Sequence, residues 1–537
     1  MSEPLRPDDL LIRRLYEELR AGRFTTALEQ LRRFSPADMT SCVQALMIVA
    51  CAGAGEYTQA ADLVENTEHM GRGRLCFDVL RFFSEQNGRQ NAKLLFQELL
   101  RRHPRDIVIY NALGECLNQA GEFEESIRIL RTALDQNPHS VETLNLLAIA
   151  EFESGDFDRC LIHFREALDI NPHTANGYSN LGCILSAAGL PDQSMKAHHK
   201  AISMCPDDAQ IRLNHSIALL KNGMWAQGWQ EHEWRLRLPQ HTNLPPERML
   251  PGLNEHDRLD GVVILITQEE GLGDTLMYLR YVSCLVARGA LVHLWVPPEL
   301  EALCRNIPGV YKVQVGGSLP EYDWHCPFIS LARVFSATSE RWGQKVPYLQ
   351  VSKSKIREMS AFTPDGRKLS VGLVWGGAPR PEQTGAFMTD RRRSMPLSHL
   401  YKLKDVRNIN LVCLQKGPYY KQLAEAPATF HISDPTEHLQ TMEDTAALLM
   451  KLDLLVAVDT SIVHLAGAIG RPVIMMDRYD NCWRWQTDTE ESLWYPDMRI
   501  IRQENPRDWS FVVSRVCDIL GKIKKPKSGT KINLFDV

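Results

Sequence analysis

Residues 454–468 have the sequence LLVAVDTSIVHLAGA, in which an apolar run ends in a polar cluster and a second apolar pattern follows. The run predicts a buried β-strand, and the cluster Asp459-Thr460-Ser461 predicts a turn that opens a helix. Backbone N–H groups at such a helix start, together with the helix dipole, attract anions. The stretch therefore predicts a parallel α/β sheet with an anion site at the end of one strand.

Working outward from this stretch, further short apolar runs predict six more buried strands. They lie in two groups, with 262–266, 292–296 and 310–315 in the first and 369–377, 411–414 and 473–476 in the second. Two doubly wound units in tandem leave a ligand cleft between the carboxyl ends of their strands. The glycine turn at 269–274 lacks the third glycine of a dinucleotide fingerprint, and no acidic residue closes the second strand, so an NAD enzyme is disfavoured.

The first half of the chain has an internal period of 34 residues. Each repeat has a glycine in a predicted turn, a small residue seven positions earlier where two helices must approach closely, and a proline that ends the second helix. The glycines are Gly121, Gly155, Gly189 and Gly223, the small residues are Gly114, Ala148, Gly182 and Ser216, and the prolines are Pro104, Pro138, Pro172 and Pro206. Gly22, Gly55 and Gly88 follow at steps of 33 and suggest two or three degenerate or capping repeats. The stack is expected to share one core and to leave an extended concave face.

Composition places the chain among ordinary soluble globular proteins. Hydrophobic residues make up 44% and charged residues 24% of the 537 residues, and the net charge of −5 favours no nucleic-acid partner. The 13 cysteines form no CxxC pair, so neither a zinc site nor a disulfide framework is expected. The N-terminus lacks the features of a signal peptide, and the most apolar stretch, 452–476, carries charges and glycines unlike a membrane span. We expect a cytoplasmic protein without a transmembrane segment.

The 34-residue pattern resembles the tetratricopeptide repeat (TPR), a helical hairpin that commonly binds other proteins. Two pairs of asparagines, Asn111 with Asn145 and Asn180 with Asn214, are also 34 residues apart. They resemble the amide ladder of O-GlcNAc transferase, whose side chains hydrogen-bond a peptide backbone regardless of its sequence. The alternatives are that these asparagines cap or bridge helices, and that the whole array is a scaffold or a dimerisation arm.

The α/β half resembles the heptosyltransferase-like glycosyltransferases of the GT-B fold. It looks closer still to bacterial TPR-containing glycosyltransferases, among which are flagellin glycosyltransferases. The motifs that carry the resemblance are Glu-x-Gly-Leu-Gly-Asp (269–274), Asp-Arg-x-Arg-Ser (390–394), Asp-Thr-x-x-x-His (459–464) and Trp-Arg-Trp (483–485). The implied fold class is α + α/β, with an N-terminal all-α TPR superhelix followed by a GT-B pair of Rossmann-like α/β domains.

The resemblance implies a catalytic role for Asp274. This residue matches the proposed general base of heptosyltransferases, which takes a proton from the acceptor hydroxyl. The alternative is a helix N-cap, a position that aspartate also suits. Gly273 beside it, and Trp375 and Gly376 in the second unit, are expected to line the donor site.

The 459–464 segment supplies a second group of implied site residues. It matches the family segment that holds the donor's nucleotide and phosphates, which assigns donor binding to Asp459, Thr460, Ser461 and His464. For His464 the alternative is a core histidine on the buried face of the helix.

Arg391, Arg392 and Arg393 are expected in a loop that contains glycine and proline. Arg391 and Arg393 match the family run and are predicted to neutralise the leaving phosphate or diphosphate, whereas Arg392 departs from it and is predicted to be a bystander. A solvated loop is the alternative. No Asp-x-Asp pair occurs after residue 250, so the resemblance implies no metal site, and no cofactor beyond a nucleotide-sugar co-substrate.

The tryptophans of the last part of the chain allow two interpretations. Trp483, Trp485 and Trp494 either line the cleft or pack inside the domain, and packing is favoured.

These patterns divide the chain into six parts. The parts are degenerate or capping helical repeats (1–104), TPR repeats (105–238), a proline-rich linker (239–260), an acceptor-side Rossmann-like domain (261–360), a nucleotide-sugar domain (361–521) and a basic tail (522–537). The tail has five lysines with a proline and a glycine, and is expected to be disordered.

The expected function is that of a metal-independent protein O-glycosyltransferase. It would move a sugar from a nucleotide sugar to a Ser or Thr of an acceptor protein docked on the concave face of the TPR array, with flagellin as the acceptor suggested by analogy. Two alternatives stay open, namely a non-catalytic TPR adaptor and a glycolipid or lipopolysaccharide sugar transferase. The sequence also leaves open the donor nucleotide and sugar, the stereochemical outcome, the oligomeric state and the number of true repeats before residue 105.

Overall fold

The computed structural model describes residues 9–34, 40–66, 69–85, 88–239, 244–269, 271–338, 343–364, 366–380, 383–527 and 530–536. The chain divides into two compact units. One consists of Met1–Thr174 with Pro379–Thr389, and the other of Ala175–Ala378 with Asp390–Val537.

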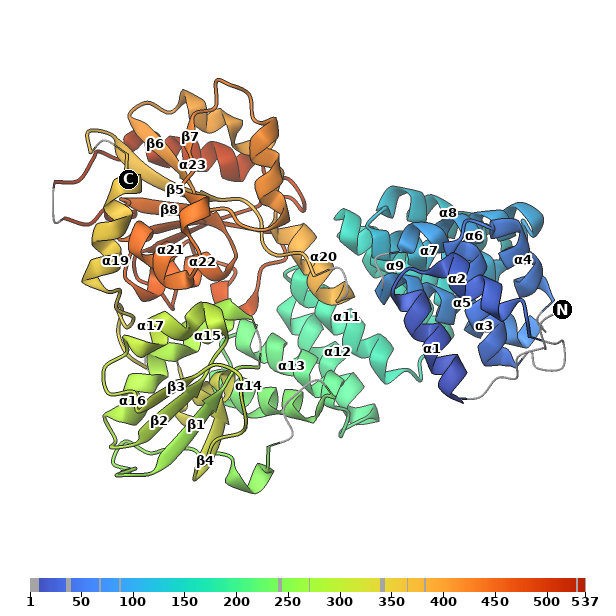
Figure 1. Cartoon of the computed structure of the whole chain (residues 1–537), viewed down its shortest axis with the longest axis horizontal. Coiled ribbons are helices and arrows are strands. Elements are labelled where there is room, and N and C mark those ends of the chain that lie inside the picture. The colour runs from blue at the N-terminus through green and yellow to red at the C-terminus, as the bar shows by residue number, and fades with distance from the viewer. Residues whose placement is uncertain are drawn as a thin grey trace. The chain divides into compact units, whose positions relative to one another are not determined.

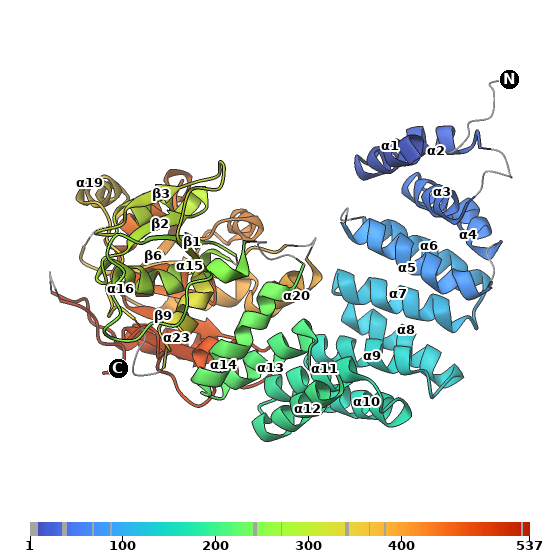
Figure 2. The same cartoon turned by 90° about the horizontal axis from the view of Figure 1, so that it is seen from below.

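The first unit is a stack of antiparallel helical hairpins (Figures 1 and 2). Its helices are α1 (Asp9–Arg20), α2 (Phe24–Leu31), α3 (Ser41–Gly53), α4 (Tyr57–Glu65), α5 (His69–Glu85), α6 (Arg89–Arg102), α7 (Ile107–Ala120), α8 (Phe123–Gln136), α9 (Val141–Ser154) and α10 (Phe157–Ile170). The hairpins from α1 to α7 share one core, in which Leu95, Phe96 and Leu117 are at most 1% exposed. A core shared between successive hairpins is expected for repeats.

The repeat glycines act as predicted at most positions. Gly121 and Gly155 follow α7 and α9 with φ of 76° and 97°, a left-handed conformation that costs other residues free energy. Gly88 differs, because its φ is −93° and it precedes α6 in an ordinary conformation. The small residue of the repeat also has the predicted use, since a Cβ on Gly114 would lie 2.5 Å from the side chain of Leu130 on α8.

The second unit begins with two more hairpins. They are formed by α11 (Ala175–Ala187) with α12 (Pro191–Met204), and by α13 (Ala209–Lys221) with α14 (Trp225–His232), followed by the 3-10 segment η2 (Glu233–Arg237). Trp229 on α14 donates from Nε1 to the carbonyl of Ala337 at 2.9 Å, which joins the last hairpin to the α/β part. The predicted TPR segment 105–238 is thus divided between the two units.

The first sheet of this unit is parallel and has the strand order β3-β2-β1-β4 among the described residues. Its strands are β1 (Val263–Thr267), β2 (Leu291–Trp295), β3 (Lys312–Gln314) and β4 (Trp324–Pro327). Its helices are α15 (Leu272–Tyr278), α16 (Val282–Val286), α17 (Glu301–Arg305) and α18 (Leu331–Val334). In the β1 to β2 register Leu265 pairs with His293.

The second sheet is also parallel, with the order β10-β9-β8-β5-β6-β7 where the chain is described. Its strands are β5 (Leu369–Val374), β6 (Ile409–Cys413), β7 (Ile432–Ser433), β8 (Leu454–Val458), β9 (Val473–Asp477) and β10 (Met498–Arg502). The helices are α19 (Lys353–Glu358), α20 (Thr384–Arg393), α21 (Met442–Leu449), α22 (Ser461–Ala468) and α23 (Ser510–Lys522). Every residue of β5, β8 and β9 is buried, which explains their continuous apolar sequences.

Two cores hold the second unit together. One lies on the α23 side of the second sheet and contains Trp375, Val456 and Val516. The other lies on the opposite side and continues through α15, α21 and α22 into the first sheet and to Trp229. Figure 1 shows α15 and α17 facing α21 and α22. The fold class predicted from the sequence, a TPR region followed by an α/β region with two parallel sheets, is confirmed.

Two local expectations were wrong. Arg391, Arg392 and Arg393 are not in a loop, because they form the last turn of α20. The basic tail is not disordered over its described residues. Leu534 is 2% exposed in the α23-side core, and Nη1 of Arg499 on β10 donates to its carbonyl at 2.8 Å. The lysines that suggested disorder flank apolar residues that the fold buries.

Within the described ranges, no helix combines the length and apolar character needed to cross a membrane.

Candidate functional site

Two helix starts meet where the two α/β domains adjoin. Helix α15 follows β1 and helix α22 follows β8, so both begin at the carboxyl end of a parallel strand, the edge where such sheets bind ligands. Gly273 on α15 lies directly over α22. A Cβ at this position would be 3.0 Å from Cδ2 of His464 and 3.4 Å from the Cα of Ser461. The close approach of the two helices therefore favours glycine at this position.

Asp274 and Arg484 connect the two domains next to this contact. Asp274 is in the first turn of α15, and Arg484 is in the 3-10 segment η11 (Trp483–Trp485) after β9. Nη2 of Arg484 donates to Oδ1 of Asp274 in an ion pair. The Asp274 side chain is 23% exposed and that of Arg484 is 17% exposed, so the pair is partly shielded from water. The sequence identified Asp274 as a base and quoted Arg484 as a motif residue, without pairing the two.

The start of α22 has the geometry of an anion site. Thr460 is its N-cap in extended conformation, with φ of −138° and ψ of 174°, but its side chain makes no capping hydrogen bond. Its Oγ1 is buried and has no hydrogen-bond partner among the described residues. Asp459 precedes it, and Ser461 begins the helix. The sequence predicted this arrangement from the polar cluster alone.

His464 is enclosed by protein. It is 5% exposed, its Nδ1 lies 3.0 Å from the hydroxyl of Tyr495, and its ring stacks on Trp485 at 5.3 Å between centroids. Burial lowers the pKa of His464 to about 4, with Arg484 acting in the same direction and Asp459 against it. The imidazole is therefore neutral at pH 7. These contacts are those of the core-histidine alternative, and donor contact by His464 stays a prediction.

A cluster of arginines and aspartates follows β9. Oδ2 of Asp480 lies 2.9 Å from Nε of Arg392 and 3.2 Å from Nη1 of Arg478, and Oδ1 lies 3.0 Å from Nη1 of Arg507. Burial acts to raise the pKa of Asp480, but these arginines lower it to about 2. Asp477 at the end of β9 is fully buried, and burial raises its pKa to about 6 despite Arg502.

The β9 cluster also contains buried donors without a hydrogen-bond partner. Nε of Arg478 and Nε of Arg484 are buried and make no hydrogen bond within the described part of the chain, while Nη1 of Arg478 makes only its ion pair with Asp480. Buried donors are nearly always satisfied, so such a group points to a ligand. Sequence analysis missed Arg478 and Asp480. The signal was available, because polar residues that directly follow a buried strand lie at the ligand edge of the sheet.

Two of the α20 arginines make ion pairs within the protein that the sequence did not predict. Arg392, predicted to be a bystander, makes the ion pair with Asp480. Arg393 donates from Nε and Nη2 to Oδ1 of buried Asp390 at 3.1 and 3.0 Å. Arg391 is exposed. The assignment of Arg391 and Arg393 to the leaving group stays a prediction, and Arg393 is already engaged by a carboxylate.

The turn after β5 is held by a glutamine. Oε1 of Gln415 accepts from the backbone N–H groups of Trp375 and Gly376, both at 2.9 Å, and its Nε2 donates to the carbonyl of Gly376 at 3.0 Å. Trp375 is fully buried, and its Nε1 donates to Gln422 at 3.1 Å. These contacts give Trp375 a packing role at the carboxyl end of β5. Donor binding by Trp375 and Gly376 stays a prediction.

The last helical hairpin reaches the segment after β9. Nζ of Lys221 at the end of α13 donates to the carbonyl of Ser186 at 3.1 Å and to that of Asn481 at 3.4 Å. Burial lowers the pKa of this lysine, and Asp480 acts against it. Trp229 packs edge-on against Trp483 at 5.4 Å between centroids. The repeat array therefore contributes side chains to the surroundings of the candidate site.

Arg235 anchors the turn that carries Asp274. It follows the last repeat, is 1% exposed, and donates to both carboxylate oxygens of Glu269 at 2.7 and 3.1 Å. Its Nη2 also donates to Ser330 at 2.8 Å. Glu269 is the first residue of the motif that ends in Asp274. The sequence gave no sign of this partner, because Arg235 belongs to no periodic pattern.

The repeat asparagines are used in two ways. Asn111 is 3% exposed and accepts from Oγ1 of Thr143 on the next hairpin at 2.8 Å. Nδ2 of Asn214 donates to Ser179 at 3.1 Å. Both bridge helices, which is the alternative to peptide binding. Asn180 is exposed.

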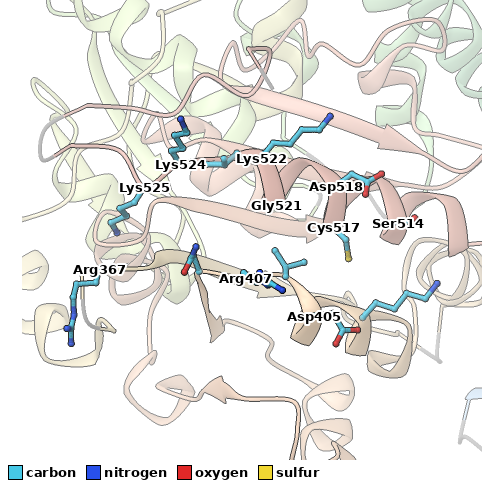
Figure 3. Close-up of a pocket in the computed structure, with 14 residues that line it drawn as sticks. Arg367, Asp405, Arg407, Ser514, Cys517, Asp518, Gly521, Lys522, Lys524 and Lys525 are labelled. Atoms are coloured by element: carbon cyan, nitrogen blue, oxygen red, sulfur yellow. The ribbon is translucent and has the colours of Figure 1, made fainter.

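A hollow of about 1110 Å³ lies away from these residues, near the amino ends of β5 and β6 (Figure 3). Figure 3 shows that the C-terminal end of α23 and the chain after it form one wall. Its cationic side chains are Arg367, Lys402, Arg407, Lys522, Lys524 and Lys525, and its acidic ones are Asp405 and Asp518. It includes none of the predicted site residues.

Family models match three segments of the chain. Residues 83–140 and 117–181 match tetratricopeptide repeats, and residues 440–506 match glycosyltransferase family 9 (heptosyltransferase). The last match contains the start of α22, the cluster after β9 and Arg484. The chain thus joins tetratricopeptide repeats to a heptosyltransferase-like glycosyltransferase 9 domain.

Individual proteins also match parts of the chain. The chain is 24% identical over 342 residues to Protein FlbA of Caulobacter vibrioides. The matched region covers 59% of this chain and 56% of that protein. It therefore spans little more than half the length of this curated relative. E. coli ADP-heptose lps heptosyltransferase II is 14% identical with a TM-score of 0.35, covering 48% of this chain and 96% of that structure. MamA is 19% identical with a TM-score of 0.26, covering 29% of this chain and 91% of that structure.

Proposed function

We propose that this protein transfers a sugar from a nucleotide sugar to a Ser or Thr hydroxyl of an acceptor protein. The observation that carries the proposal is the meeting of α15 and α22, with Asp274 of one domain facing Arg484 of the other. A carboxylate on one side suits a base for the acceptor hydroxyl. A helix start and buried guanidinium groups on the other side suit the donor's phosphates. The family 9 match over residues 440–506 supports the same class of reaction.

In this proposal each side of the site has one task. Asp274 accepts the proton of the acceptor hydroxyl as the new glycosidic bond forms and the bond from the sugar to the phosphate breaks. The backbone N–H groups at the start of α22 hold the phosphates, together with Arg478 and Arg484. Because positive charge from these arginines stabilises the leaving group, we propose a metal-independent reaction. The two parallel-sheet domains act as a GT-B pair.

We propose that the helical repeats hold the acceptor protein and that the reaction takes place in the cytoplasm. The tetratricopeptide matches support protein binding, and the exposed Asn180 is available to a peptide backbone. Flagellin is the first acceptor to test, on the strength of the resemblance to TPR-containing flagellin glycosyltransferases.

Nucleotide binding is the first test. The full chain is heated with UDP, GDP, ADP or CMP, and one of them should raise the melting temperature, because a ligand that binds only the folded state stabilises it. The full chain is used because Trp229 and Arg235 precede the α/β domains and pack within them. If none of the four nucleotides shifts the melting temperature, the proposal is contradicted.

Sugar transfer is the second test. The protein is co-expressed with flagellin, and the intact mass of flagellin is measured for wild type and for Asp274→Asn. We expect a mass increase with wild type and at least a hundredfold slower increase with the variant, since a general base contributes factors of about 10² to 10⁴. Equal modification by both would remove Asp274 from the mechanism. Unmodified flagellin together with labelled lipopolysaccharide would support the lipopolysaccharide alternative instead.

A further inference from the structure

Arg484 occupies a position between the base and the helix start. Its Nη2 is bonded to Asp274, its Nη1 donates to Sγ of Cys482 at 2.9 Å, and its guanidinium lies 4.6 Å from the centre of the Trp483 ring. Its Nε is buried and has no hydrogen-bond partner within the described ranges. The guanidinium is thus held by one carboxylate and keeps an unused donor.

The groups around Arg484 place it next to the predicted phosphate site. Burial acts to lower the pKa of Arg484, while Asp274, Cys482, Tyr278 and Asp459 raise it. Asp459 directly precedes the N-cap of α22, and the neighbouring Trp485 stacks on His464 of the same helix. An anion at the start of α22 would therefore face the same guanidinium that now holds Asp274.

We infer that Arg484 exchanges partners when the donor binds, leaving Asp274 for the donor's phosphate and thereby freeing Asp274 to act as the base. This inference rests on the proposed function and adds to it a positioning residue that links the two halves of the site. Arg484 pairs with Asp274 when no donor is bound, and with the donor's phosphate when the donor is bound.

The chemistry of the two partners favours the exchange. The diphosphate of a nucleotide sugar carries about two negative charges spread over roughly four non-bridging oxygens, against one charge and two oxygens on a carboxylate, so a guanidinium can bond it more strongly. A carboxylate oxygen that accepts from a guanidinium is a poor proton acceptor, because protonation would break a charge-assisted hydrogen bond. The base therefore becomes competent only after the donor has bound, which imposes the order donor first, acceptor second.

A double-mutant cycle on nucleotide affinity tests the exchange. The dissociation constant of the nucleotide that stabilises wild type most among UDP, GDP, ADP and CMP is measured for wild type, Asp274→Asn, Arg484→Gln and the double variant. Asp274→Asn should tighten binding about fivefold to tenfold, because Arg484 no longer has to leave a charged partner. Arg484→Gln should weaken binding at least tenfold.

The double variant separates the exchange from simple repulsion. If Arg484 changes partners, adding Asp274→Asn to Arg484→Gln alters affinity less than twofold. If Asp274 only repels the phosphate, the tightening persists in the Arg484→Gln background, and the inference is overturned. Absence of tightening by Asp274→Asn in the wild-type background also overturns it.

Two controls complete the experiment. Glu301→Gln and Arg305→Gln remove the partners of an exposed ion pair on α17, which is 2.6 Å long, and should leave nucleotide affinity unchanged. If Arg484→Gln does not fold, the effect of Asp274→Asn is measured at 0.05 and 0.5 M NaCl. If Asp274→Asn acts by removing the direct, shielded pair, its effect on affinity should differ by less than about twofold between the two salt concentrations. If it acts by removing repulsion across solvent, its effect should nearly vanish at 0.5 M NaCl, and this result overturns the inference.

Nucleotide binding and sugar transfer by the wild-type protein distinguish failure of the proposed function from failure of the exchange alone. A wild-type protein that binds none of the nucleotides contradicts the proposed function and the exchange together. A wild-type protein that binds a nucleotide and transfers sugar, but shows no coupling between Asp274 and Arg484, keeps the proposed function and removes only the exchange.

Discussion

A methyl group on Gly273 of α15 would lie 3.0 Å from His464 of α22, closer than ordinary van der Waals contact, although the sequence separates the two residues by 191 positions. His464 cannot move aside easily, because Trp485 stacks on it and Tyr495 is hydrogen-bonded to it. The spacing of the two helix starts therefore depends on this one glycine.

Gly273→Ala should damage both stability and nucleotide binding. A Cβ that lies 3.0 Å from His464 must push α15 and α22 apart, at a cost of about 1–3 kcal/mol. Urea unfolding and the nucleotide dissociation constant measure the two effects. Gly271→Ala is the matched control, because the nearest atom to its Cβ would be Oδ2 of Asp274 at 3.8 Å, and it should change stability by less than about 0.5 kcal/mol. Equal effects of the two substitutions would contradict the prediction.

His464 should make the protein less stable in acid. Its folded pKa of about 4 lies below the ordinary value of 6.5, so the unfolded chain binds a proton that the folded chain does not between these pH values. The free energy of unfolding therefore contains the full contribution of the neutral ring above pH 6.5. This contribution falls by about 3 kcal/mol as the pH drops toward 4.

The measurement is urea unfolding of wild type and His464→Gln at pH 7.5, 6.5, 5.5 and 4.5. The stability gap between the two proteins should shift in favour of the variant as the pH falls. Asp477 acts in the opposite direction, because its raised pKa of about 6 makes the folded form bind a proton first, but it is present in both proteins and cancels in the comparison. A gap that does not change with pH would show that His464 is not held neutral.

Breaking the Arg235–Glu269 pair should cost far more than breaking a surface pair. Glu269→Gln leaves a buried guanidinium with one carboxylate fewer, and removing one partner of a buried pair typically costs about 3–5 kcal/mol. Arg305→Gln on α17 is the control, with an expected loss below about 0.5 kcal/mol. Similar losses of unfolding free energy for the two variants would disprove the anchoring role of Arg235.

Truncation at the boundary between the two units should separate the tasks of the protein. A fragment of residues 175–537 retains Lys221, Trp229 and Arg235 and is expected to fold and bind nucleotide as the full chain does. Its modification of an acceptor protein should fall at least tenfold. A fragment of residues 239–537 lacks these side chains and should precipitate or lose nucleotide binding. Thermal shift and acceptor mass measure both fragments, and full acceptor modification by the 175–537 fragment would refute the docking role of α1–α10.

The sequence predicted the periodic parts of this fold well, because period and backbone conformation depend on local residues. The glycines at Gly121 and Gly155 need a left-handed conformation and revealed the repeat. Long buried strands such as β5 and β8 were visible as apolar runs. The short strands β4 and β7, and β10 with an arginine at each side of its apolar centre, gave no comparable signal.

The site was predicted in parts rather than as a whole. Asp274 was predicted from the resemblance to heptosyltransferases, and the start of α22 from the polar cluster that follows a buried strand. Their neighbours Arg484 and Arg478 come from a segment without periodicity, and their position depends on how β9 ends and how the two domains pack. Arg392 was predicted to be a bystander because it departs from a motif, yet it is one of three arginines that contact Asp480. The tail was misjudged because lysine content outweighed Leu534, whose burial depends on tertiary contacts.

The division of the repeats between the two units has a consequence for how acceptor preference can change. Helices α1–α10 form a unit that ends at Thr174, apart from the insertion Pro379–Thr389, whereas α11–α14 belong to the unit of the α/β domains and α13 and α14 share its core. Recombination or gene fusion at Thr174 could exchange the outer hairpins for those of another repeat protein without disturbing Lys221, Trp229 or Arg235. Under the proposed function, such an exchange would change the acceptor, while the inner hairpins would be inherited together with the α/β domains.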